Sequence, residues 1–249
     1  MADSQRRVLA TAPPIDVVLG RVAGLRQRIE EAGRDPAGVR IVAVTKGFST
    51  SAVEAARRAG LYDIGENYAD ELLAKVADST VAAASTVATS ARANDDGDDA
   101  PVTRWHYLGA VQRRRVRVLA PVVSCWQTLS RAVEGETIAT HAPGATVFVE
   151  IDATEVPGRN GCRPSEAPAL VASLRGSGLD VRGLMTVGPP GPPEESRGAF
   201  RLTAALARDL GLPEVSMGMT DDLEVALSEG STMVRVGRAL FGERPLRPA

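Results

Sequence analysis

The sequence is poor in cysteine, histidine and aromatic residues. Its 249 residues include two cysteines, Cys125 and Cys162, two histidines and 4% aromatic residues. Because the cysteines lie far apart and lack the spacing of metal ligands, we expect reduced thiols rather than a disulfide. No cluster of histidine, cysteine and carboxylate residues is present, so we also expect no metal site.

Two further absences narrow the class of protein. The net charge is -2, so no overall positive charge draws the chain to nucleic acid or to an acidic membrane. No apolar stretch approaches the length of a membrane span, and the first residues, MADSQRRVLATAPP, lack the apolar segment of a secretory signal. We therefore expect a cytoplasmic protein with neither a membrane nor a nucleic-acid partner.

What the chain does have is an alternation of strand-like and helix-like segments after an N-terminal helix at 14–36. The strand-like segments are VRIVAVTKG, YDIGEN, RWHYLG, PVVSCW, ATVFVEID, DVRGLMTVG, EVSMG and TMVRVG. Strands that alternate with helices indicate βα units and a parallel sheet. Eight strands in a chain of this length predict a single α/β domain over residues 1–249, a (β/α)8 TIM barrel with an extra N-terminal helix.

One segment breaks the alternation. Residues 78–101, DSTVAAASTVATSARANDDGDDAP, are dominated by alanine, serine and threonine and end in an acidic cluster. Such a segment cannot bury enough apolar surface to offset the entropy lost on ordering. The composition predicts a disordered surface insertion, with a functional lid as the alternative.

Polar residues and glycines follow several of the predicted strands. Lys46 follows the first strand, Asn67 the second, Ser216 lies at the seventh and Gly237 follows the eighth. A lone lysine after a strand is most often solvated, but a barrel gathers the ends of all its strands on one rim, where active sites are built. The expected proximity of these residues on one rim therefore predicts a functional site around Lys46.

The loops after the seventh and eighth strands fit a phosphate site. Barrels often bind phosphate there, and Gly218 and Gly237 would let backbone N–H groups approach an anion. Ser216 and Thr220 add hydroxyl donors. Taken singly, a glycine beside a strand end is more often a tight turn.

Arg235 lies within TMVRVG, a run typical of a buried strand. A buried charge is tolerated only when it is paired or hydrogen-bonded. A lysine and a phosphate cradle on one rim suggest a phosphorylated aldehyde held as a Schiff base, for which pyridoxal 5'-phosphate (PLP) is the obvious candidate. Arg235 would then donate to the pyridine nitrogen; the alternative is an ion pair with a buried carboxylate such as Glu66.

The sequence resembles the pyridoxal phosphate homeostasis protein family, relatives of the barrel domain of alanine racemase (fold type III). The matching segments are IVAVTKGFS, DIGENYADELL, RWHYLGAVQ, RGLMTVG, SMGMTDDLEVALSEGSTMVRVGRALFG and, more loosely, EVPGRNGC. The resemblance implies that Lys46 forms the aldimine, that Arg235 faces the pyridine nitrogen and that Asn67 lines the pocket. It also implies that Ser216, Gly237 and the neighbouring backbone, at Met217, Gly218 and Arg238, hold the phosphate.

The chain departs from the family pattern at three places. Arg113–Arg115 replace a polar Ser/Thr-Asn-Lys, and Ser130 precedes Arg131 where the family has Asp-Arg. Arg238 replaces a small hydroxylated residue, which leaves a backbone contact to phosphate possible there but not the family's side-chain contact. None of the three touches Lys46 or Arg235.

The arginine at the pyridine nitrogen favours a carrier over an enzyme. It keeps its proton, so the ring nitrogen stays unprotonated and withdraws electrons weakly. Racemases with this arginine add a tyrosine base from a second domain; seven residues follow Gly242 here, so we expect no such domain. The resemblance implies a protein of PLP homeostasis that buffers PLP and passes it to apo-enzymes, with amino acids as possible regulators. Because the second domain of a racemase carries a dimer surface, its expected absence favours a monomer. The alternative is an amino-acid racemase of the same fold.

A third interpretation depends on QRRRVRVLAP, in which Arg113 and Arg117 share a helical face. A basic patch could contact nucleic acid or a partner's phosphate. A solvated helix surface is the more common meaning. Of the histidines, His106 either faces the barrel interior near a cofactor or is structural, and His141 is expected in a loop.

Overall fold

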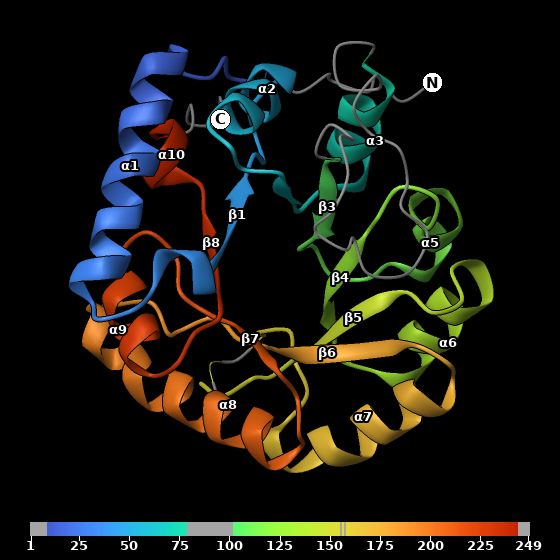
Figure 1. Ribbon diagram of the computed structural model, residues 1–249. Helices are drawn as coiled ribbons and strands as arrows, with labels where there is room; N and C mark the ends of the chain where they lie inside the picture. The colour runs from blue at the N-terminus through green and yellow to red at the C-terminus, as the bar shows by residue number, and fades with distance from the viewer. Residues whose placement is uncertain (1–8, 79–101, 155, 157, 244–249) are drawn as a thin grey trace.

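Short runs of β-branched and apolar residues form parallel strands that close into a barrel (Figure 1). The computed structural model describes residues 9–78, 102–154, 156 and 158–243. The strands are β1 (Arg40–Val44), β2 (Asp63–Glu66), β3 (Arg104–Tyr107), β4 (Cys125–Leu129), β5 (Thr146–Glu150), β6 (Asp180–Met185), β7 (Glu214–Ser216) and β8 (Met233–Val236). Each pairs with the next, and β1 pairs with β8, which confirms the predicted barrel.

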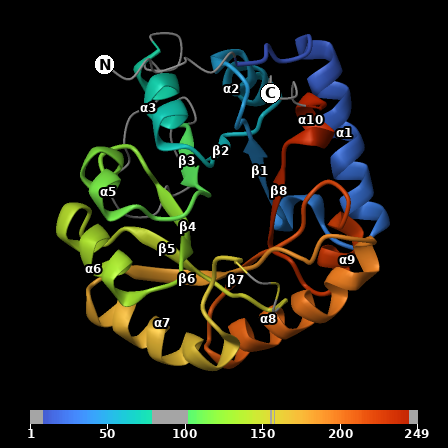
Figure 2. The same ribbon diagram turned by 180° about the vertical axis from the view of Figure 1, so that it is seen from behind.

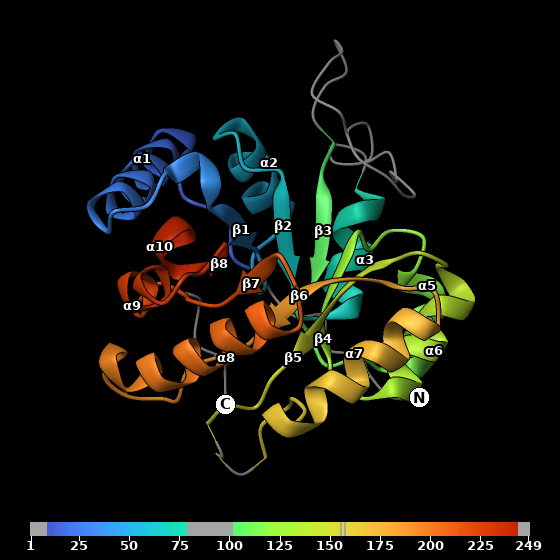
Figure 3. The ribbon, with the colours of Figure 1, turned by 60° about the horizontal axis from the view of Figure 1, so that its bottom comes forward.

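Helices form a ring outside the strands, as Figures 2 and 3 show from two other directions. They are α1 (Ile15–Glu31), α2 (Thr50–Arg58), α3 (Ala69–Ala77), α5 (Arg113–Leu119), α6 (Ala132–His141), α7 (Ala167–Gly176), α8 (Arg197–Asp209), α9 (Leu223–Ser228) and α10 (Arg238–Phe241). Short 3-10 turns occupy Pro36–Gly38, Pro164–Glu166 and Pro193–Ser196. Within the described residues, no helix combines the length and apolar character needed to cross a membrane.

The buried apolar residues fall into two clusters, because alternate residues of each strand face inward and outward. The larger cluster lies between the strands and the helices. The smaller one fills the barrel interior and consists of Val42, Cys125, Phe148, Met185 and Met233. Every second residue of a strand faces inward, so the same alternation turns some polar residues of β3, β4, β7 and β8 into the interior. These residues build the site.

The predicted N-terminal helix is present as α1, which ends at Glu31 rather than at residue 36. It buries Val18, Val22, Leu25 and Ile29, whose spacing of three and four residues places them on one face. This face packs on α2, α9 and α10, beside the junction of β1 and β8. The helix therefore covers the part of the barrel where its first and last strands meet.

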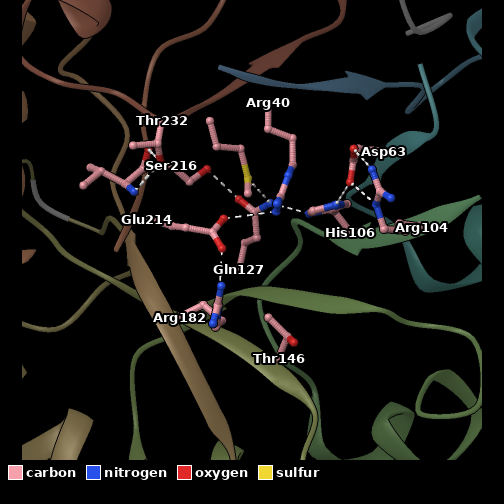
Figure 4. Close-up of polar contacts among 12 residues, drawn as sticks. Arg40, Asp63, Arg104, His106, Gln127, Thr146, Arg182, Glu214, Ser216 and Thr232 are labelled. Atoms are coloured by element: carbon pink, nitrogen blue, oxygen red, sulfur yellow. Dashed lines mark hydrogen bonds and ion pairs between the residues drawn. The ribbon is translucent and has the colours of Figure 1, made fainter. Parts of the chain in front are cut away.

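Charged residues close the mouth of the barrel formed by the amino-terminal ends of the strands. Arg40 of β1 pairs with Glu214 of β7 at 3.0 Å, and Arg104 of β3 pairs with Asp63 of β2 at 2.6 Å (Figure 4). Arg182 of β6 also reaches Glu214, at 3.4 Å. The open mouth is therefore the opposite one, at the carboxyl ends.

Two positions differ from the sequence-based predictions. The fourth strand was expected at PVVSCW, but β4 begins at Cys125, because Pro121 and Val122 form the turn that ends α5. His141 was expected in a loop and is instead the last residue of α6. Both cysteines are free, as expected. The insertion predicted at 78–101 lies outside the described residues, apart from Asp78.

Candidate functional site

A cavity of about 490 Å³ lies at the carboxyl ends of the strands and collects most of the predicted site residues. Its lining residues are Val44, Lys46, Phe48, Asn67, Leu108, Glu150, Met185, Val187, Met219, Thr220, Asp221, Arg235, Gly237, Arg238, Gly242 and Glu243. The volume suits one small organic ligand. The barrel thus brings Lys46, Asn67, Arg235, Gly237 and Arg238 to one place, as their positions after the strands predicted.

Lys46 reaches the cavity from the turn after β1, two residues beyond Val44, which faces the same space. The sequence contains one other lysine, Lys75, and every remaining basic side chain is arginine or histidine. Lys46 is partly exposed, whereas Lys75 is 1% exposed. Lys46 is therefore the lysine that a molecule in the cavity can meet.

Lys75 lies beneath the turn that carries Lys46. Its ammonium donates to the carbonyl oxygen of Thr45 at 2.8 Å and forms an ion pair with Glu66, which is fully buried. Burial raises the pKa of Glu66, and the charge and hydrogen bond of Lys75 oppose that rise. Glu66 is thus committed to Lys75, and the alternative that it pairs with Arg235 is wrong.

Arg235 faces the interior from β8, two residues after the inward-facing Met233. Its guanidinium donates from Nη1 to the carbonyl oxygen and hydroxyl of Ser216, both at 2.7 Å, and from Nη2 to the carbonyl oxygen of Thr186 at 2.8 Å. Among the described residues these bonds use three of its five N–H donors, leaving the Nε–H and one Nη2–H. Burial lowers the pKa of Arg235 to about 10, against the negative charge of Glu150, so the side chain stays cationic at neutral pH.

Three of the predicted phosphate residues lie below the cavity rather than on its wall. Ser216 is fully buried, and its hydroxyl donates to Gln127 at 2.7 Å while accepting from Arg235. Met217 is fully buried. Gly218 adopts a φ of +94°, and its carbonyl accepts the backbone N–H of Arg235 at 3.0 Å. Ser216 and Gly218 hold Arg235, and a direct contact from any of the three residues to phosphate stays a prediction.

The rim near β8 is polar and close-packed. Gly237 lies where a Cβ would approach the carbonyl oxygen of Val44 to 3.0 Å, so the end of β8 passes tightly against β1. Arg238 forms an ion pair with Asp221 across the rim. Thr220 accepts the backbone N–H of Ala239 at 3.2 Å. This part of the wall offers backbone groups, a hydroxyl and a cation side by side.

Asn67 presents an unsatisfied acceptor near the cavity. Its Nδ2 donates to the carbonyl oxygen of Leu108 at 3.5 Å. Its Oδ1 is buried and finds no donor among the described residues. A buried acceptor without a donor is uncommon and indicates a place for a hydroxyl or a water.

Glu150 is a wall residue that the sequence analysis missed. It ends β5, is 9% exposed and accepts a hydrogen bond from Asn160. Burial raises its pKa, while the Asn160 hydrogen bond and the charge of Arg235 oppose the rise. The alternation Thr146, Phe148, Glu150 along β5 carries the signal that it faces inward.

A second cavity of about 430 Å³ adjoins the first at Asn67. Its other lining residues are Tyr68, Ala69, Asp70, Tyr107, Gln112, Arg114 and Arg115. Arg115 forms an ion pair with Asp70. Arg113, Arg114 and Arg117 are exposed, which fits the solvated helix surface expected for this run.

Comparisons with known proteins show which family the chain belongs to. The model of the alanine racemase N-terminal domain family matches residues 22–245. A protein of Pseudomonas aeruginosa named pyridoxal phosphate homeostasis protein is 34% identical over 230 residues, which cover 89% of this chain and 92% of the relative. The chain belongs to the pyridoxal phosphate homeostasis protein family.

Solved structures agree with this membership. PipY of Synechococcus elongatus, a structure with PLP bound, superposes with a TM-score of 0.71 at 26% identity, over 90% of this chain and 100% of PipY. Alanine racemase of Corynebacterium glutamicum superposes with a TM-score of 0.66 over 98% of this chain and 66% of the racemase. Its 17% identity shows the shared barrel alone. The homeostasis-protein barrel is therefore the fold of alanine racemase's larger domain without strong sequence likeness to it.

Proposed function

We propose that the protein binds PLP in the cavity between Lys46 and Arg235 and serves intracellular PLP homeostasis as a carrier. The observation that supports this most directly is that Lys46 and Arg235 line one cavity of ligand size. PLP is also the ligand named for the PipY structure, and homeostasis is the role named for the Pseudomonas relative.

The residues present fit the chemistry of PLP. Bound there, PLP supplies an aldehyde that a lysine amine holds covalently and reversibly. Lys46 would hold the aldehyde carbon, and the spare N–H donors of Arg235 suit the lone pair of the ring nitrogen. Asn67 lines the same cavity and would place its amide beside the ring hydroxyl. The backbone at Gly237 and Arg238 suits the phosphate.

Arg235 makes the site better suited to holding PLP than to catalysis. The guanidinium keeps its proton because even the lowered pKa, about 10, lies above neutral pH. With PLP bound, Arg235 would donate a hydrogen bond to the ring nitrogen without protonating it, and the ring would then withdraw electrons weakly. Of the three tyrosines in the sequence, none lines the cavity that contains Lys46. The tyrosine base of a racemase is therefore without a candidate among the described residues of this wall.

The test of PLP binding is the absorption spectrum of the protein during titration with PLP. The proposal predicts a visible band that differs from that of free PLP and that borohydride bleaches. Lys46→Arg, which keeps the positive charge but cannot form the covalent link, should lack the band. A wild-type protein whose spectrum equals that of free PLP would refute the proposal.

The carrier role has a separate test, which is transfer of PLP to an apo-enzyme. Loaded wild-type protein should restore activity to the apo-enzyme, and protein fixed by borohydride should not. Restoration at the same rate by free PLP at its equilibrium concentration would show that the protein acts only as a buffer.

The racemase alternative predicts exchange of the amino-acid α-proton with solvent. We expect the rate in deuterated water to stay close to that of free PLP for every amino acid tried. A rate well above that of free PLP for any amino acid would favour the racemase.

We further propose a monomer located in the cytoplasm, without a nucleic-acid partner, that delivers PLP to apo-enzymes. The exposed arginines of α5 support no more than a solvated surface, since the chain as a whole carries a net charge of -2. Light scattering should give the mass of one chain. Retention on nucleic acid that falls with salt and disappears in Arg113→Ala/Arg117→Ala would contradict the proposal that the protein has no nucleic-acid partner.

A further inference from the structure

Buried polar side chains form one continuous hydrogen-bonded chain from the closed mouth of the barrel to Arg235. Figure 4 shows most of its members projecting into the barrel from neighbouring strands. They are Asp63 of β2, His106 of β3, Gln127 of β4, Ser216 of β7 and Arg235 of β8. Each of the five is at most 6% exposed.

The donors in this chain all point the same way. Arg235 donates to the Ser216 hydroxyl at 2.7 Å, and that hydroxyl donates to the Gln127 carbonyl oxygen at 2.7 Å. The Gln127 amide nitrogen lies 2.7 Å from Nδ1 of His106, and Nε2 of His106 lies 2.8 Å from Asp63. Because the Gln127 oxygen accepts from Ser216, its nitrogen must donate, so Nδ1 of His106 is the acceptor and Nε2 carries the proton.

The closed mouth anchors the chain. Arg104 donates to both carboxylate oxygens of Asp63, at 2.9 and 2.6 Å. Burial alone raises the pKa of Asp63, but the hydrogen bonds from Arg104 and His106 outweigh burial and hold the pKa well below its usual range. Asp63 therefore remains a fixed acceptor at neutral pH, and it orients the His106 ring.

Apart from the hydrogen-bonded chain of side chains, nothing in the structure requires a polar residue at position 127. Apart from His106 and Ser216, the interior holds an apolar cluster, and the Gln127 amide also lies 3.2 Å from the sulfur of one of its members, Met233. An apolar side chain there would extend the interior cluster and would leave no buried amide to satisfy. What Gln127 does supply is an acceptor that fixes the rotamer of Ser216, whose lone pair in turn faces Nη1 of Arg235.

We propose that His106 and Gln127 are positioning residues that fix the Ser216 hydroxyl and thereby hold the Arg235 guanidinium with its spare N–H groups toward the cavity. The consequence for PLP rests on the proposed function, in which those N–H groups meet the ring nitrogen. The orientation of Arg235 itself is a property of the ligand-free chain.

The first test therefore uses the ligand-free protein. Nitrogen-15 NMR should show His106 with a protonated Nε2 and an unprotonated Nδ1; His141 is the one other histidine in the sequence. Both Nη nitrogens of Arg235 should give separate signals in the wild type, because hydrogen bonds restrain their rotation. In Gln127→Met, exchange between these two signals should become faster, because the bond to the Ser216 hydroxyl is weakened while the bonds to the carbonyl oxygens of Ser216 and Thr186 remain. An exchange rate equal to that of the wild type in a folded Gln127→Met protein would overturn the proposal.

The second test compares PLP affinities in two backgrounds. Gln127→Met should weaken PLP binding about tenfold, the effect of one lost hydrogen bond to a charged group. In Arg235→Met, which has no guanidinium to orient, the same substitution should change affinity by less than about twofold. A loss of similar size in both backgrounds would mean that Gln127 acts through general packing and would overturn the proposal.

A matched control and a second variant keep the result interpretable. Met233→Leu changes a neighbour of Gln127 at similar volume without cutting the chain, and it should leave the exchange rate of the Arg235 signals unchanged. Ser216→Ala cuts the chain one link nearer Arg235 and should reproduce the faster exchange if Gln127→Met does not fold. The carbocyclic analogue of PLP, which lacks the ring nitrogen, should bind wild type and Gln127→Met equally.

The two proposals fail in different ways. If no variant binds PLP, the proposed function is refuted, and the NMR signals of the ligand-free protein still decide the role of Gln127. If PLP binds equally to wild type and Gln127→Met, the positioning role is refuted and PLP binding stands.

Discussion

Among the described residues, one lysine and one arginine are buried, Lys75 between α3 and the barrel and Arg235 inside the barrel, and their partners differ. Lys75 is paired with the carboxylate of Glu66, so its charge is neutralised where it lies. The hydrogen bonds of Arg235 go instead to two carbonyl oxygens and a hydroxyl. An arginine held by neutral acceptors keeps both its charge and some of its donors for a ligand. The Lys75 pair supports the fold, and Arg235 serves the site.

Removing one member of the Lys75–Glu66 pair should be costly. In Lys75→Met the Glu66 carboxylate would stay buried without its cation, and the free energy of unfolding should fall by about 3–5 kcal/mol. Urea denaturation measures this. Adding Glu66→Gln to Lys75→Met should recover part of the loss. As the control, Arg58→Met breaks the exposed pair with Glu54 and should cost no more than about 1 kcal/mol. Equal losses for both pairs would contradict this account.

Asp63 should make the protein sensitive to acid. Its pKa is lower in the folded protein than in the unfolded chain, because the hydrogen bonds from Arg104 and His106 outweigh its burial. The resulting stabilisation is complete above the unfolded pKa, about 3.9, and is lost as the pH falls below it toward the folded pKa.

Unfolding at a series of pH values tests this. Asp63→Asn should lower the free energy of unfolding at pH 7 by about 2–3 kcal/mol and flatten its decline below about pH 4. Asp221→Asn, which alters an exposed ion pair, should leave that decline unchanged. A decline of equal steepness in Asp63→Asn and the wild type would contradict the assignment.

The connection from β7 to α9 is the element in which the path of the backbone matters most to the site. Gly218 follows β7 with a φ of +94°, and a Cβ there would lie 2.5 Å from the Cβ of Ala226. Its carbonyl accepts the N–H of Arg235 at 3.0 Å, so a shift of this turn moves β8 as well. Glycine is required at this position both for its φ and for the space.

A comparison with Gly230 separates the requirement for a positive φ from the requirement for space. It has a φ of +95°, but nothing lies within 4 Å of its would-be Cβ. Gly230→Ala should therefore cost about 1–3 kcal/mol from backbone strain alone. Gly218→Ala should cost a further 1–3 kcal/mol or so from overlap with Ala226, and it should weaken PLP binding. Denaturation and PLP titration of both variants measure this; equal costs would show that the overlap relaxes freely.

The elements themselves could be predicted from the sequence except at β4. The barrel, its eight strands and the rim position of Lys46 follow from β-branched runs that alternate with helical segments. The fourth strand was predicted four residues too early, because Val122 and Val123 suggest a strand while Cys125–Leu129 contains two polar residues. Gln127 and Thr128 are tolerated in that strand because each finds a buried hydrogen-bond partner.

Hydrogen-bond partners that are distant in sequence also limit prediction of the site. Lys46, Asn67 and Gly237 were found because each follows the end of a strand, and Arg235 because it is a charge within an apolar, strand-like run. The partners of Arg235 come from strands 19 and 49 residues away in sequence, and no local pattern reports such pairings. Glu150 was overlooked although the alternation along β5 turns it inward.

At the scale of the whole molecule, the two mouths of the barrel have different tasks. Ion pairs between strands close the amino-terminal mouth, and the carboxyl-terminal mouth holds the cavity. The polar chain through Gln127 joins the two. A ligand seated in the cavity would contact the ends of β1, β2 and β8, including both strands that close the barrel.

PLP should therefore stabilise the entire fold. A ligand that binds only the native state adds about 2.7 kcal/mol at a concentration one hundred times its Kd. Thermal unfolding should show a higher Tm with PLP for the wild type and a much smaller rise for Lys46→Arg. Pyridoxamine 5'-phosphate, which lacks the aldehyde, should give similar, small rises with both proteins. A full rise with PLP in Lys46→Arg would show that the covalent link contributes nothing.

The most direct test of the central claim is mass spectrometry of the PLP-saturated protein after borohydride reduction and proteolysis. A chain with two lysines offers few other amines, and Lys75 is sealed in the interior. We expect one phosphopyridoxyl group per chain, located on the peptide that contains Lys46. Modification of the amino terminus or of Lys75 instead, with Lys46 unmodified, would contradict it.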